Sequence, residues 1–158
     1  MEKANLPRPA VLLGLAGLAP QACCVALVVI AGPYQWIGLA AGCFYAAIIL
    51  SFLGGLWWMA ALLSGETRTW IYGLAVLPSR AGWAALLPWN MGWPWPGPSL
   101  IVLGWVLLAS PLADVAISRH VTFPAGWLRL RAAMAVGLGL LTLALAALDA
   151  AKMQVQIA

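Results

Sequence analysis

Charged residues are the scarcest class in this sequence. Asp, Glu, Lys and Arg make up 8% of the chain, whereas a soluble domain carries about 25%. The 57 residues from position 9 to position 65 contain none of them. A helix crosses the bilayer core with about 20 apolar residues, so this stretch alone can hold two spans. The composition therefore excludes a soluble domain and predicts an integral membrane protein.

Groups that carry chemistry are equally scarce. A single histidine, His120, excludes bis-histidine haem ligation within one chain. The cysteines, Cys23, Cys24 and Cys43, lack the CxxC spacing of a metal site. Cys24 and Cys43 fall at similar predicted depths, so a redox pair remains an alternative to simple packing of small buried side chains.

Catalytic patterns are missing as well. The sequence contains no nucleophile–base pair, no phosphate-binding loop and no paired carboxylates. We therefore expect no enzyme, no metal and no cofactor. The excess of basic residues is explained by membrane topology, as described below, so it does not imply nucleic acid.

Five helical spans are predicted in a single domain covering residues 1–158. Apolar and polar residues do not alternate as in a membrane β-barrel, and backbone groups in lipid must be satisfied within helices. The first apolar run is too long for a cleaved signal and is retained as an anchor. The breaks between spans contain Gly-Pro, charged residues or the proline-rich segment PWNMGWPWPGP. The spans are roughly 10–31, 38–62, 70–88, 99–117 and 130–149.

The cations predict an orientation. If the N-terminus is inside, the inner side collects six cations, namely Lys3, Arg8, Arg68, Arg119, Arg129 and Arg131. The outer side collects only Lys152, and Arg80 is left out because it falls within a span. An excess of Lys and Arg marks the cytoplasmic side of a membrane protein. We therefore predict an all-α bundle of about five transmembrane helices, N-inside and C-outside.

Small residues line one face of the second predicted span. Helix association in lipid depends on close packing, which small side chains permit. Gly38, Gly42 and Ala46 form one ridge, which Gly54 continues, and Ala47, Ser51 and Gly55 form the neighbouring ridge. We interpret these ridges as a groove that admits another helix. A hinge or a ligand cavity at the Gly54-Gly55 pair is the alternative.

Two ionisable residues fall within predicted spans and are candidates for a ligand contact or an ion pair. Arg80 is near the middle of the third span, where an arginine is costly unless it meets a partner or a wet cavity. Asp114 is the only acidic residue of the fourth span. Ideal helices place the two residues on the order of 10 Å apart in depth. We expect Arg80 to face the bundle interior.

The proline-rich connection carries a second candidate surface. Trp89, Trp93 and Trp95 form an outer aromatic loop stiffened by prolines, which could bind a ligand. The alternative is a belt of tryptophans at the membrane interface.

Several segments resemble a known family. They are GLAGLAP at 14–20, Tyr45 followed by IILSFLGG at 48–55, VLPS at 76–79 with Trp83, and Pro124 with Trp127, Leu128 and Arg129. In this order they resemble the small membrane-protein family called domain of unknown function 3429, whose animal relative is transmembrane protein 69. The resemblance covers most of the chain and implies a multi-helix fold in a bacterial inner membrane or, alternatively, a mitochondrial inner membrane. It implies no activity, and Arg80 lies outside the pattern.

Two functional hypotheses follow. The first is an accessory or assembly subunit that packs in the lipid bilayer against other membrane proteins. The second is a small-ligand sensor or transporter similar to the tryptophan-rich sensory proteins, suggested by the length, the five spans and the ten tryptophans. Co-purification with a partner would favour the first hypothesis, and thermal stabilisation by a ligand would favour the second.

Overall fold

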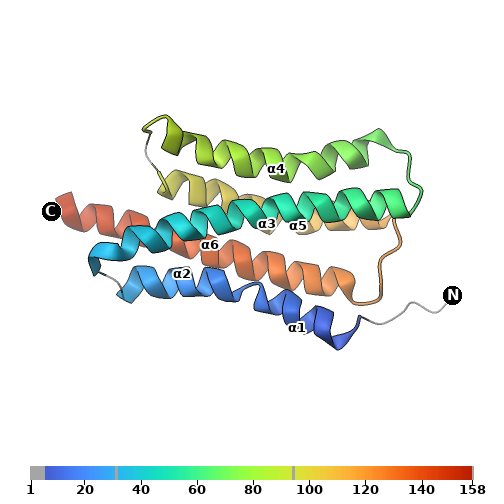
Figure 1. Ribbon diagram of the computed structural model, residues 1–158, viewed down its shortest axis with the longest axis horizontal. Coiled ribbons are helices and arrows are strands. Elements are labelled where there is room, and N and C mark those ends of the chain that lie inside the picture. Colours follow the sequence, from blue (N-terminus) through green and yellow to red (C-terminus); the bar gives the residue numbers. More distant parts are fainter. Residues whose placement is uncertain (1–5, 31, 94, 158) are drawn as a thin grey trace.

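Helices account for all regular secondary structure in the described residues. The structure, a computed structural model, describes residues 6–30, 32–93 and 95–157, without the side chains of residue 33 and residues 152–157 (Figure 1). The elements are α1 (Arg8–Ala16), α2 (Ala19–Ile30), the 3-10 turn η1 (Gly32–Tyr34), α3 (Gln35–Leu63), α4 (Thr69–Asn90), α5 (Gly97–Ser118) and α6 (Trp127–Ile157). The predicted all-helical fold class is confirmed.

Four helical segments of the described residues are long and apolar enough to cross a membrane. They are Arg8–Ile30, Gln35–Leu63, Gly97–Ser118 and Trp127–Ala151. The remaining predicted span, 70–88, corresponds to α4, which is as long as α5 but less apolar because it contains Arg80 and Asn90. The long apolar helices support the assignment as a membrane protein.

The first predicted span is broken into two helices. α1 ends before Gly17, and α2 begins at Ala19, so a turn interrupts the expected helix 10–31, whose last residue lies outside the described residues. The cause is Pro20, which has no N–H to donate to the carbonyl four residues earlier. The Tyr45 hydroxyl, from α3, donates to the carbonyl oxygen of Gly17, which lies in the turn between α1 and α2, at 2.5 Å.

Successive helices form antiparallel hairpins around α3. Figure 1 shows α1 beginning and α6 ending at opposite ends of the bundle. α3 packs against α2, α4, α5 and α6, while α5 packs most extensively against α6. The central position of α3 follows from its sequence, which is apolar or small on nearly every side. Its largest fully buried side chains are Leu50 and Leu53.

The predicted small-residue groove is present along part of α3. A Cβ atom on Gly38 would lie 2.9 Å from the carbonyl oxygen of Cys24 in α2. A Cβ on Gly54 would overlap the carbonyl oxygen of Ala75 in α4. Ala46 and Ala47 are buried as well. The glycines therefore allow two neighbouring helices to approach the backbone of α3.

The prediction of the second ridge, Ala47, Ser51 and Gly55, is only partly correct. Ser51 and Gly55 are exposed, and a Cβ on Gly55 would meet no atom within 4 Å. The two glycines differ because neighbouring residues of a helix point about 100° apart. Gly54 faces α4, while Gly55 faces the outside of the bundle. Of the adjacent glycines, only Gly54 therefore lies in the groove, and the expectation that Ser51 and Gly55 line it is wrong.

A second close crossing, between α5 and α6, is not predicted by the sequence analysis. A Cβ on Gly104 would lie 3.3 Å from the carbonyl oxygen of Gly139, and a Cβ on Gly139 would lie 3.1 Å from that of Gly104. The two glycines face each other across the most extensive helix contact. Their mutual approach follows the small-residue rule for helix packing in lipid.

A buried polar contact joins the first and last long segments. The side-chain amide of Gln21, in α2, donates to the Thr142 hydroxyl in α6 at 2.9 Å. The Thr142 hydroxyl in turn donates to the carbonyl oxygen of Leu138 at 2.7 Å. Both Gln21 and Thr142 are 0% exposed. The contact fixes α2 against α6 by a hydrogen bond that lipid could not supply.

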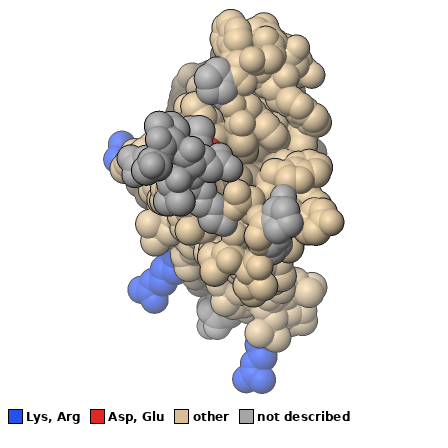
Figure 2. All heavy atoms as spheres, turned by 90° about the vertical axis from the view of Figure 1, so that its left-hand side faces the viewer, with Lys and Arg blue, Asp and Glu red and all other residues tan. Residues whose placement is uncertain are grey.

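Exposed cations gather at one end of the bundle. Arg8, Arg68, Arg119 and Arg129 are exposed at the end where α1, α4 and α6 begin. Figure 2 looks onto the opposite end, where nearly all described atoms belong to uncharged residues and the blue Arg side chains project only from the margins. The charge asymmetry expected from the sequence is therefore a property of the folded bundle.

Candidate functional site

Three helices bring an indole, a carboxylate and a guanidinium together inside the bundle. The Trp57 indole N–H in α3 donates to Oδ1 of Asp114 in α5 at 2.7 Å. Nε of Arg131, in α6, lies 3.3 Å from Oδ2 of the same carboxylate. The three residues are 4%, 2% and 6% exposed, respectively. We call Trp57, Asp114 and Arg131 the buried polar cluster.

The position of the cluster follows from the hairpin of α5 and α6. Asp114 lies four residues before the end of α5 at Ser118, and Arg131 lies four residues after the start of α6 at Trp127. Equal distances from the turn place the two side chains at equal depth in antiparallel helices. Trp57 reaches the same level from the last two turns of α3. The cluster therefore sits near the end of the bundle that carries the exposed arginines.

The cluster is only partly satisfied. The contact between Arg131 Nε and Asp114 Oδ2 is an ion pair without the alignment of a hydrogen bond, and Arg131 Nη2 is buried with no hydrogen-bond partner among the described residues. The opposite charges of Asp114 and Arg131 cancel. Three buried atoms of the pair are left without a hydrogen bond among the described residues, namely Nε and Nη2 of Arg131 and Oδ2 of Asp114.

An apolar cavity of about 280 Å³ lies directly beside the cluster. Trp57, Asp114 and Arg131 form part of its wall, and the aromatic rings of Phe123 and Trp127 form another part. These two rings stack with centroids 6.1 Å apart. The cavity thus combines an apolar interior with flat aromatic walls, while Nη2 of Arg131, which has no hydrogen-bond partner among the described residues, is buried behind its wall.

Arg80 does not belong to this cluster. Asp114, its proposed partner, pairs with Arg131 instead, and Arg80 makes no ion pair within the described residues. Arg80 is exposed, so the expectation that it faces the bundle interior is wrong. Arg80 points outward because of its position around the helix. The buried residues of α4, such as Ala75, Pro78 and Gly82, lie on the face opposite to Arg80.

The side chain of Arg80 instead lines an open groove of about 510 Å³ between α4 and α5. The rest of the groove is formed by apolar side chains such as Leu77, Ala84 and Val106, together with Ser110. Arg80 is thus an exposed cation in the middle of a long helix with mostly apolar neighbours.

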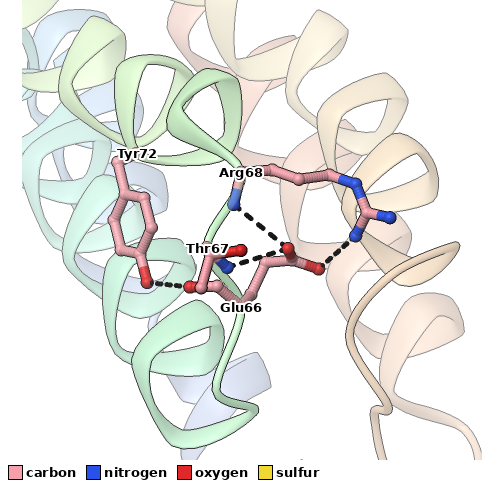
Figure 3. Close-up of polar contacts among 4 residues, drawn as sticks. All are labelled: Glu66, Thr67, Arg68 and Tyr72. Atoms are coloured by element: carbon pink, nitrogen blue, oxygen red, sulfur yellow. Dashed lines mark hydrogen bonds and ion pairs between the residues drawn. The ribbon is translucent and has the colours of Figure 1, made fainter.

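The connection between α3 and α4 is organised around Glu66 (Figure 3). Its carboxylate accepts the backbone N–H groups of Thr67 and Arg68 at 2.9 and 3.1 Å and pairs with the Arg68 guanidinium at 2.6 Å. Burial alone would raise the pKa of Glu66, but the backbone N–H groups of Arg68 and Thr67 and the Arg68 charge outweigh it and hold the pKa below its usual value. The hydroxyl of Tyr72 donates to the Glu66 carbonyl at 2.7 Å. These bonds shape a turn and leave no reactive group.

The predicted aromatic loop is mainly a packing element. The rings of Trp89 and Trp95 stack at 5.2 Å, and both contact the Phe44 ring of α3. Trp93 points away and is 62% exposed. The arrangement gives Trp89 and Trp95 a role in holding the connection against α3, and whether Trp93 belongs to an interfacial belt or to a ligand-binding surface stays a prediction.

The three cysteines are free thiols. Cys43 is 0% exposed in the core, Cys24 is half-buried and Cys23 is exposed. The packing interpretation of Cys24 and Cys43 therefore agrees with the structure, and the redox pair is not formed.

Sequence reasoning identified Asp114 but missed Trp57 and Arg131 as its partners. In the sequence analysis, Arg131 is only a marker of orientation, and Trp57 is assigned no role. The sequence does contain a signal for the Asp114–Arg131 pair, because the two residues lie at equal distances from the connection between α5 and α6. Nothing in the sequence indicates which of the adjacent tryptophans, Trp57 or Trp58, faces inward.

The fold and the long apolar helices define this chain as an all-helical membrane protein with a buried polar cluster. A family model described as Protein of unknown function (DUF3429) matches residues 6–147. The chain therefore belongs to that family, as the sequence segments indicated. No curated protein and no solved structure matches it.

Proposed function

We propose that this protein crosses the membrane five times, with the N-terminus inside and the C-terminus outside. α4 supports a fifth span because it packs along α3, one of the four long apolar segments, and, with 22 residues, is about 33 Å long. The exposed arginines at one end of the bundle support the orientation. Lys3 and the side chain of Lys152 lie outside the described residues, so the proposal rests on the other cations.

The orientation is tested by reporter fusions. A reporter that is active only outside the cytoplasm is expected to score after Ala158 and to be silent when inserted at Gly65, in the turn between α3 and α4. The reason is that five crossings place these positions on opposite sides. A cytoplasmic reporter at the same two sites serves as the control. Activity of both fusions on one side would contradict the five-span topology.

Within that topology, the protein acts as a non-enzymatic accessory or assembly subunit of a larger complex in a bacterial inner membrane or, alternatively, a mitochondrial inner membrane. The observation that supports this role is Arg80, exposed in the groove between α4 and α5. An arginine at the centre of a lipid-facing helix costs about 2.5–3.5 kcal/mol. A transmembrane helix of another protein, bearing an acidic side chain, would fill the groove and compensate the charge.

A lipid headgroup is a poorer partner for Arg80 than a protein helix. Arg80 lies near the middle of α4, with about 15 Å of helix on either side. A guanidinium on a flexible stem can reach only part of that distance towards the interface. A carboxylate at the same depth on a neighbouring helix requires no such displacement.

The partner is sought by photo-crosslinking in intact membranes. A photoreactive residue at Ala84, in the groove, is expected to give a defined adduct with another membrane protein, and Arg80→Leu is expected to abolish it. The same residue at Ala26, on the exposed face of α2, is the matched control. Because Arg80 is exposed and has no ion-pair partner among the described residues, Arg80→Leu is expected to leave the melting temperature of the purified protein unchanged or raised. An adduct that persists in Arg80→Leu would contradict the assignment of the groove.

A further inference from the structure

A cavity of about 690 Å³ opens at the connection between α5 and α6, at the end of the bundle that carries the exposed arginines. Its wall comprises the last residue of α5, the second half of the connection and the first turn of α6. The polar side chains of this wall belong to Ser118, Thr122 and Arg129. Thr122 and Arg129 are exposed, so a ligand in the cavity can reach them directly.

These polar side chains have bonding capacity to spare. Arg129 makes no ion pair, and the Thr122 hydroxyl makes no hydrogen bond, within the described residues. The Ser118 hydroxyl donates to the carbonyl oxygen of Val115 at 2.8 Å, so only its lone pairs remain. Arg129 therefore offers a positive charge with its N–H donors, and Thr122 adds a hydroxyl donor. A guanidinium beside a hydroxyl suits an anionic oxygen group such as a phosphate.

The charge of Arg129 is left for a partner from outside the chain. The acidic residues that the structure describes at this end, Glu66 and Asp114, already pair with Arg68 and Arg131. An anion in the cavity would therefore meet an exposed cation and no uncompensated carboxylate of the described residues.

Exposed apolar surface adjoins the cavity on the side that leads along the helices. Leu128 lies in the wall and is exposed. Val115 lies one helical turn before Ser118 on α5, Leu112 lies one turn before Val115, and both are exposed. A ligand with an anionic head and an apolar tail can contact the cavity and this surface together, whereas a soluble anion can use only the cavity.

We propose that this cavity binds the headgroup of an anionic phospholipid, with the phosphate at Arg129 and Thr122 and an acyl chain along Val115 and Leu112. A volume of about 690 Å³ accommodates a phosphate and a small polar substituent such as glycerol. In the proposed topology this end of the bundle faces the cytoplasmic leaflet, where anionic lipids attract basic residues. Binding in detergent micelles depends neither on that orientation nor on a partner at Arg80, so the proposals can fail separately.

Binding is tested with phosphatidylglycerol added to the full-length protein in a non-ionic detergent. The melting temperature is expected to rise in a saturable manner, and native mass spectrometry is expected to show a single retained lipid. Phosphatidylcholine has the same phosphate and acyl chains but no net charge, and it is expected to give the smaller shift.

Variants separate the cavity from the general positive charge of this end. Arg129→Gln is expected to raise the phosphatidylglycerol concentration at half-maximal shift roughly fivefold, the effect of one cation near anionic lipid. Arg129→Lys keeps the charge and is expected to retain most of the affinity. Arg8→Gln removes an exposed cation outside the cavity wall and is expected to bind like the wild type.

A second variant tests the space rather than the charge. Ala125 lies in the cavity wall, so Ala125→Phe fills the cavity and is expected to abolish the retained lipid. Ala26→Phe, the same change on the exposed face of α2, is expected to keep it. The melting temperature of every variant without lipid is measured alongside, which separates lost binding from lost folding.

Three outcomes would overturn the proposal. Equal shifts with phosphatidylglycerol and phosphatidylcholine would show that the site does not select an anion. Equal weakening by Arg8→Gln and Arg129→Gln would assign the effect to the net charge of the bundle end. An equal shift with glycerol 3-phosphate at the same concentration would mean that the cavity takes a soluble phosphate compound instead of a lipid.

Discussion

Gly54→Ala is expected to destabilise the bundle, whereas Gly55→Ala, one residue later, is expected to be neutral or slightly stabilising. A Cβ on Gly54 overlaps the carbonyl oxygen of Ala75, a backbone atom that cannot swing aside, so α4 must shift. Overpacking of this kind costs about 1–3 kcal/mol. The melting temperature and the yield of folded protein in detergent measure the effect.

The neighbouring substitution is the matched control. Alanine is favoured over glycine in a helix by about 0.5–1 kcal/mol, and this gain applies at both positions. A Cβ on Gly55 meets nothing within 4 Å, so Gly55→Ala has no steric cost and keeps only the higher helix propensity of alanine. The difference in sign between the two variants therefore isolates the contact with α4. Equal melting temperatures of Gly54→Ala and Gly55→Ala would refute the close approach of α3 and α4.

Asp114→Ala is expected to have the larger effect. The substitution leaves the Arg131 guanidinium without its counter-charge and the Trp57 indole N–H without its acceptor, all within a buried site. Removing one partner of a buried ion pair costs about 3–5 kcal/mol. We expect the melting temperature of the purified protein to fall by on the order of 10 °C. Arg129→Gln, which removes an exposed arginine from the same helix as Arg131, is the control and is expected to have little effect.

A double variant separates charge from packing. Asp114→Asn with Arg131→Gln removes both charges, and the asparagine side chain keeps an acceptor oxygen for Trp57. Because no unpaired charge remains, the double variant is expected to be more stable than Asp114→Ala. If the double variant is the less stable of the two, the ion pair itself, rather than the avoidance of an unpaired charge, dominates at this site.

The sequence predicts the helices well because apolar run length and breaking residues are local properties. The proline-rich segment after Asn90 and the charged turn at Glu66 end helices close to the predicted boundaries. The break at Gly17 was missed because Pro20 alone does not decide between a kinked helix and two helices. That choice depends on the Tyr45 hydroxyl, which comes from another helix and satisfies the carbonyl of Gly17.

The site was harder to predict because it depends on helix rotation. Composition shows that Arg80 and Asp114 are costly in a membrane, but it does not show the direction in which each side chain points. The structure turns Arg80 outward and Asp114 inward to meet Arg131. The same limit applies to Gly54 and Gly55. A difference of one residue, about 100° around the helix, decides between close packing and open space.

The hydrogen bond between Gln21 and Thr142 has a consequence for how the chain is made. The two residues are separated by 121 positions, so α2 enters the membrane long before α6 exists. Until then the Gln21 amide lacks this partner in an environment that offers few others. The last helix to be synthesised, α6, therefore supplies the hydrogen-bond partner of a residue in α2. In a chain released before α6 is made, the Gln21 amide is exposed to lipid, whereas it is buried in the complete bundle.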